Sequence, residues 1–310
     1  MLQRRLQHLA ATMAVSVMAA GVLTLVGTKP VLAEFEIQES QVEKGEVELE
    51  YRGAYHWGLP RGGEGGGTGV IADEEGGEVE EDGEEVPLRQ SHDFEMQMGI
   101  TDRWMFSTTF GTVVPEGGNW QTESVEIETQ YEIIQREGNG LGLAFAVGYG
   151  IATQRDVANE LEFGPIVELG LGNFLLTTNT FFSDQQGEFA EAEGLGFEYG
   201  WRAEYDFSKS WGVGVEMFGE IEDLANAGSF GDQEHSIGPT IFFKLGEERD
   251  EAGDYAGEAR SHREDGDDDD DDNGATKAPE MEFSMNVGLQ FGLTDMTSDG
   301  ALKFQAEFAF

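Results

Sequence analysis

Apolar and polar residues alternate one by one along most of this chain. The stretch EVELEYR at 46–52 places valine, leucine and tyrosine on one face of an extended strand, and glutamate and arginine on the other. The last ten residues, ALKFQAEFAF, repeat the pattern and end on an aromatic residue. Because successive side chains of a strand point to opposite faces, this period of two predicts β-strands with one apolar and one polar face.

The same alternation predicts about twelve strands of roughly ten residues, the length that a tilted transmembrane strand needs. They are expected at 46–57, 93–100, 104–114, 123–134, 141–151, 160–169, 173–182, 195–206, 211–221, 235–245, 281–293 and 301–310. Pro165 and Pro239 fall inside two of these strands, and each follows a glycine. A proline removes one ladder hydrogen bond, so a bulge or kink is expected at both places.

Two all-β architectures explain such a pattern. A β-sandwich turns its apolar faces inward, whereas a transmembrane barrel turns them outward to lipid. Three features favour the barrel: the polar face is rich in carboxylates, short and long connections alternate, and four tryptophans lie near strand ends. These tryptophans are Trp57, Trp104, Trp120 and Trp211. The predicted fold is therefore an antiparallel up-and-down transmembrane β-barrel.

The C-terminal strand adds a family resemblance. A terminal strand of alternating apolar residues that closes on phenylalanine resembles the assembly signal of Gram-negative outer-membrane β-barrels, and Phe304, Phe308 and Phe310 occupy its apolar positions. The resemblance extends over residues 45–310 and identifies no substrate-specific family. It implies a location in the outer membrane, contact with outer-membrane lipid and lipopolysaccharide, and recognition by the barrel-assembly machinery.

The first 33 residues have the features of a secretory signal peptide. Arg4 and Arg5 precede an apolar run at about 9–26, and cleavage is expected after Ala33. A membrane anchor is the alternative, because the run nearly reaches the roughly 20 residues that span a bilayer. Residues 34–44 are expected to form a periplasmic lead-in to the barrel, or else an extension of its first strand.

Composition excludes several functions. The chain has no cysteine, so disulfides and cysteine-metal sites are excluded, and its net charge of −44 is wrong for nucleic-acid binding. The acidic segments 58–90 and 246–280 cannot bury enough apolar surface to order themselves. They are predicted to be disordered, solvated loops, with loose binding of Ca²⁺ or Mg²⁺ as the alternative. No cofactor is expected.

The candidate site is the lumen of the barrel. Strand parity turns a set of carboxylates inward: Glu48, Glu50, Asp93, Glu95, Glu126, Glu128, Glu132, Glu198, Glu204, Glu216 and Glu220. The basic residues that parity turns inward are Arg52, Arg202, Lys244 and Lys303. Small residues at 142–150 leave room on one inner wall for long side chains or for a solute. An acidic bore attracts cations and repels anions.

Two functions remain open at this stage. The first is passage of small solutes, with a preference for cations or neutral species. The second is a structural or surface-interaction barrel with a closed lumen, in which Arg52 and Arg202 pair with glutamates and the acidic loops bind divalent cations. An enzyme is not expected, because His56 is turned inward, His92 and His235 are turned outward, and no Ser–His–acid spacing is present.

Overall fold

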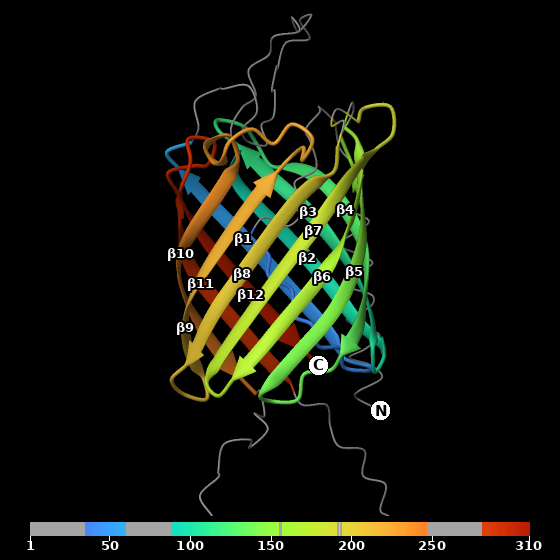
Figure 1. Ribbon diagram of the computed structural model, residues 1–310, viewed down its shortest axis with the longest axis vertical. Coiled ribbons are helices and arrows are strands. Elements are labelled where there is room, and N and C mark those ends of the chain that lie inside the picture. Colours follow the sequence, from blue (N-terminus) through green and yellow to red (C-terminus); the bar gives the residue numbers. More distant parts are fainter. Residues whose placement is uncertain (1–34, 60–87, 155–156, 191, 193, 247–280) are drawn as a thin grey trace, which may run out of the picture.

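The computed structural model describes residues 35–59, 88–154, 157–190, 192, 194–246 and 281–310. Within them, twelve tilted strands form one closed antiparallel barrel, in which every strand pairs with its sequence neighbours and the first pairs with the last (Figure 1). The strands are β1 (Val47–Trp57), β2 (Leu88–Thr101), β3 (Trp104–Pro115), β4 (Gln121–Ile134), β5 (Gly140–Ala152), β6 (Asn159–Leu171), β7 (Phe174–Gln186), β8 (Gly196–Asp206), β9 (Trp211–Ile221), β10 (Glu234–Leu245), β11 (Glu282–Gly292) and β12 (Gly300–Ala309). A short 3₁₀ helix, η1 (Phe230–Asp232), precedes β10. The predicted signal peptide at 1–33 and most of both acidic segments lie outside the described residues.

The barrel closes between β1 and β12. Glu48 lies opposite Ala309 at one end of this pair, and Trp57 lies opposite Gly300 at the other. The start of β1 and the end of β12 therefore share one mouth, called here the terminus-side mouth, and the opposite opening is the far mouth. The connections 102–103, 135–139, 172–173 and 207–210 are at the terminus-side mouth. These four connections are short, as predicted. β10 also ends and β11 begins at this mouth, and the segment between them, 246–281, is long, so the predicted alternation of short and long connections is not kept there.

The start of β2 differs from the expectation. Residues 88–90, predicted as the end of an acidic loop, are the first residues of this strand. Arg89 explains the difference, because its guanidinium donates a hydrogen bond of 2.7 Å to the His56 carbonyl oxygen and pairs with Glu116. The contacts of Arg89 thus extend β2 toward the far mouth, beyond the alternating residues 93–100 from which the strand was predicted.

The two strand prolines interrupt the sheet on one side only. Pairing of β6 with β7 stops at Phe163 and resumes at Ile166 in the same register, and β10 has a matching gap toward β11. A Cβ on Gly164 or Gly238, the glycines before the prolines, would collide with a carbonyl oxygen of the neighbouring strand. A local opening of the ladder that depends on glycine therefore takes the place of the predicted bulge.

The outer face of the barrel is apolar. Ile127, Val147 and Val215, near the middle of their strands, are 44%, 40% and 40% exposed. Close to the terminus-side mouth, aromatic side chains of neighbouring strands form pairs with centroids 4.6–5.1 Å apart: Trp104–Tyr131, Phe174–Tyr205 and Trp211–Phe243. An apolar band bordered by aromatic residues is typical of a barrel surrounded by lipid, and it is the opposite of a sandwich, which buries its apolar face.

Candidate functional site: the bore and its inner segment

The strand alternation places every predicted lumen residue on the inner face. Eight of the carboxylates are buried there: Glu50, Asp93, Glu95, Glu126, Glu128, Glu132, Glu204 and Glu216. Glu48, Glu198 and Glu220 are partly exposed inside the barrel. Arg52, Arg202 and Lys303 are buried as well, and Lys244 is partly exposed.

Residues 35–44, called here the inner segment, lie inside the bore. Phe35 stacks on His56 near the far-mouth end of β1, with ring centroids 5.8 Å apart. Ten residues later, the backbone N–H of Gly45 donates a 2.8 Å hydrogen bond to the Gly99 carbonyl near the terminus-side mouth. The inner segment thus runs along the bore before the chain turns into β1. This corrects the periplasmic lead-in expected for 34–44, because polar groups of the wall draw residues 35–44 inward.

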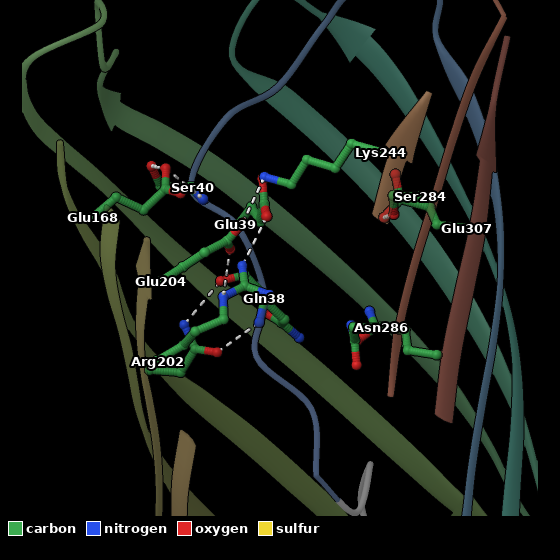
Figure 2. Close-up of polar contacts among 12 residues, drawn as sticks. Gln38, Glu39, Ser40, Glu168, Arg202, Glu204, Lys244, Ser284, Asn286 and Glu307 are labelled. Atoms are coloured by element: carbon green, nitrogen blue, oxygen red, sulfur yellow. Dashed lines mark hydrogen bonds and ion pairs between the residues drawn. The ribbon is translucent and has the colours of Figure 1, made fainter. Parts of the chain in front are cut away.

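Side chains of the wall bind the main chain of the inner segment, of which Figure 2 shows Gln38, Glu39 and Ser40. The backbone N–H of Gln38 donates to the Asn179 side-chain oxygen at 2.7 Å, and the Asn179 amide donates to the Gln38 carbonyl at 3.1 Å. The Gln130 amide donates to the Glu39 carbonyl at 3.0 Å. Asn179 therefore offers a donor and an acceptor to the same residue, as a neighbouring strand would.

The small residues of β5 make room for the inner segment. The Ser40 hydroxyl donates to the Glu168 carboxylate at 2.5 Å, and the Ser40 backbone N–H donates to the same oxygen at 3.3 Å. A Cβ on Gly142 would collide with the Ser40 hydroxyl, and one on Gly148 would collide with the Glu126 carboxylate. The space that the sequence predicted on this wall is therefore occupied by the chain itself.

Arg52 joins the inner segment to β1 and β2. Its Nη1 atom lies 3.0 Å from Glu36, 2.6 Å from Glu50 and 2.7 Å from Glu95. One buried guanidinium is thus surrounded by three carboxylates. Glu36 belongs to the inner segment, and the other two belong to the wall.

Arg202 joins the inner segment to the other side of the barrel. Its Nη2 atom lies 2.8 Å from the Glu39 carboxylate, and its Nε lies 3.7 Å from Glu204. Glu204 also pairs with Lys244 at 3.1 Å. Because β8 is five strands away from β1 in the closed order β1-β12-β11-β10-β9-β8, the two arginines hold the inner segment from nearly opposite walls.

Space remains on one side of the inner segment. On the side of β4 and β6 the fit is tight, since Gln130, Glu132 and Glu168 have no exposed surface. The Glu39 side chain, in contrast, is 54% exposed although it lies inside the barrel. Figure 2 shows Ser284 and Glu307 across this space from the inner segment. Solvent therefore reaches the bore between the inner segment and the wall formed by β10–β12.

A second buried cluster lies on that wall. Lys303 of β12 pairs with Glu216 of β9 at 2.6 Å, and the Thr240 hydroxyl of β10 donates to the same carboxylate oxygen at 2.6 Å. The Lys303 ammonium also lies 5.2 Å from the centre of the Phe218 ring. This cluster links three strands near the seam at which the barrel closes.

The histidines lie where parity predicted. His56 faces the bore, where its Nδ1 is 3.1 Å from the Ser298 hydroxyl. His92 and His235 face outward in two matching clusters: Tyr51 and Trp120 surround His92, and Tyr199 and Phe230 surround His235. The repeated Gln-x-His sequence at 90–92 and 233–235 was the signal for this match, and sequence reasoning missed it.

Sequence reasoning also missed the residues that hold the inner segment, above all Glu36, Glu39, Gln130 and Asn179. The only signal was the alternation of Phe35 and Ile37 with polar residues, which indicates an extended segment but not its position. Among the described residues, no group of three or more histidines and carboxylates has the geometry of a metal site. No helix in the described part of the chain is long and apolar enough to cross a membrane.

Among known proteins, similarity to this chain is found in solved structures. No family model matches the chain, and no curated protein matches it. The NanC porin is 7% identical, with a TM-score of 0.44, and the match covers 84% of this chain and 98% of that one. A bacterial polysaccharide outer membrane secretin is 9% identical, with a TM-score of 0.35 over 88% of this chain and 99% of that one. OprD of Pseudomonas aeruginosa is 9% identical, with a TM-score of 0.33 over 88% of this chain and 96% of that one.

Proposed function

We propose that this protein is a channel in the outer membrane of a Gram-negative bacterium and that it passes small solutes, with a preference for cations and uncharged molecules. The closed barrel, its apolar outer face and its aromatic border support the location, because a closed barrel leaves no unpaired strand edge in lipid. The excess of inward carboxylates over Arg52, Arg202, Lys244 and Lys303 is the observation on which the preference rests.

The charge balance of the bore follows from its ion pairs. Arg52 contacts three carboxylates, and Lys303 contacts Glu216, so each base is already neutralised by its neighbours. Bore carboxylates of the described residues that take no part in these ion pairs, among them Glu126 and Glu128, then determine the sign of the potential along the bore. A negative potential within low-dielectric walls concentrates cations and excludes anions, and salt screens it over about 10 Å at 0.1 M.

One observation favours a second function, that of a closed structural barrel. The inner segment is held from opposite walls and occupies part of the bore, so it narrows any path for a solute. The binding of divalent cations by the acidic loops belongs to this alternative. It stays a prediction, because 60–87 and 247–280 lie outside the described residues.

Reversal potentials in a planar bilayer under a KCl gradient test the proposal. We expect the unaltered protein to be cation-selective, and Glu126→Gln and Glu128→Gln to lower the ratio of cation to anion permeability, because glutamine keeps the volume but removes the charge. Glu188→Gln is the matched control, since it makes the same change at an exposed position between β7 and β8. Anion selectivity, or a ratio that the bore variants leave at the control value, would contradict the mechanism. A silent bilayer would favour the closed barrel.

A further inference from the structure

We infer that the wall of the bore is a binding site for an extended acidic peptide, and that the inner segment is its resident ligand, bound reversibly as a plug. The inference concerns binding of a chain segment and does not depend on whether ions pass. Residues 36–40 are contacted by side chains of five strands of the wall: β1, β4, β6, β7 and β8.

The wall recognises main-chain groups. Asn179 binds both the N–H and the carbonyl of Gln38, Gln130 binds the carbonyl of Glu39, and Glu168 accepts from the N–H of Ser40. Three successive residues of the inner segment thus have backbone groups bound by side chains of three different strands. Such contacts require an extended backbone but place no demand on the identity of the bound side chains.

Two arginines add a preference for acidic residues. Glu36 pairs with Arg52 and Glu39 pairs with Arg202, so the carboxylates are three residues apart and point to opposite walls. An extended chain rises by about 3.3 Å per residue, and an odd spacing turns two side chains to opposite sides. The spacing in the sequence therefore matches the placement of the arginines on β1 and β8.

The character of the contacts indicates that binding is reversible. Within the described residues, positions 35–42 make no backbone–backbone hydrogen bond to the wall, whereas each barrel strand is joined to both of its neighbours by a ladder of backbone hydrogen bonds. The deeply buried apolar side chains of the inner segment are Ile37 and Val42, each 5% exposed. Water and ions can replace the remaining polar contacts, and the barrel keeps its ladders when the segment leaves.

Cysteine labelling in the full-length protein tests the inference, because the chain has no native cysteine. Ser40→Cys places a thiol at a position with no exposed surface, and Ser229→Cys supplies an exposed reference. The rate of reaction with a small charged thiosulfonate reagent then reports how often the inner segment leaves its site. Heat-modifiable gel mobility selects folded barrels for the measurement.

Asn179→Ala in the Ser40→Cys protein removes both hydrogen bonds to Gln38. We expect labelling to accelerate about thirtyfold, the factor that two ordinary hydrogen bonds are together worth. Asn286→Ala is the matched control, because Asn286 also faces the bore but bonds to Gln305 of β12. Glu39→Gln changes only the inner segment and should also accelerate labelling, whereas Glu43→Gln, at the end of the segment, should not.

Equal rates for Asn179→Ala and Asn286→Ala would overturn the inference. It would also be overturned if Ser40→Cys reacted as fast as Ser229→Cys in the otherwise unaltered chain. A silent bilayer combined with the expected labelling rates would refute the proposed channel and leave the binding site standing. A cation-selective channel with unchanged labelling rates would do the reverse.

Discussion

Removing the Lys303 cation should destabilise the barrel more than removing any other bore lysine. The side chains of Lys303 and Glu216 are 4% and 0% exposed, and their charged atoms are 2.6 Å apart. Lys303→Met leaves the Glu216 carboxylate buried, with the Thr240 hydroxyl as its hydrogen-bond partner and with Arg202 as the more distant positive charge. Breaking a buried pair on one side costs about 3–5 kcal/mol, because the remaining charge is uncompensated.

The loss is measured as the free energy of unfolding in urea, followed by tryptophan fluorescence in lipid vesicles. Lys244→Met is the control: Lys244 is 19% exposed, and its partner Glu204 keeps Arg202 nearby, so the change should cost about 1 kcal/mol or less. In the double variant Lys303→Met/Glu216→Leu both charges are gone, and most of the stability should return. A cost below about 1 kcal/mol for Lys303→Met, or additive losses in the double variant, would refute the reasoning.

Two further predictions concern the outer face and the seam. Ile127→Arg should cost roughly 2–4 kcal/mol in the same urea experiment, because Ile127 faces lipid near the middle of β4, while Leu49→Arg near the start of β1 should cost about 0–1 kcal/mol. Equal losses from Ile127→Arg and from an inward Glu128→Arg would contradict the assignment of the two faces. Deleting Phe310 should lower the fraction of heat-modifiable barrel, because the Phe310 backbone exchanges two 3.0 Å hydrogen bonds with Val47 at the seam. Shortening the aspartate run at 267–272 is the control, and equal assembly of the two proteins would contradict a role of Phe310 in closing the barrel.

The fold could be predicted from the sequence because its signal is local and repeated. In each strand, successive side chains face lipid and the bore in turn, so the alternation of apolar and polar residues predicts both the strand and the direction of each side chain. In β4, for example, Glu126 and Glu128 face the bore and Ile127 faces outward, as parity alone predicts. The start of β2 escaped this reasoning, because Arg89 extends the strand through contacts with residues that are distant in sequence.

The inner segment could not be predicted, because its contacts are long-range and bind main-chain groups. Gln38 and Asn179 are 141 positions apart, and nothing about an asparagine on an inward-facing position indicates that it binds a backbone. The alternation at 35–38 resembles that of a strand, but the barrel is already closed by twelve strands between 47 and 309. An extended segment without a place in the sheet can lie on the outside or in the bore, and only the distribution of polar partners decides between them.

Release of the inner segment would change the two arginines unequally, and this links the two proposals. Arg52 would keep Glu50 and Glu95 at 2.6 and 2.7 Å, so its charge would stay neutralised. Arg202 would lose its closest carboxylate and keep Glu204 at 3.7 Å, an acid that Lys244 already shares. The wall at β8 would therefore become more positive, while the wall at β1 would change little. A channel without its plug should for this reason be wider and less selective for cations, because the departing segment removes carboxylates from the bore and leaves one arginine exposed to passing anions.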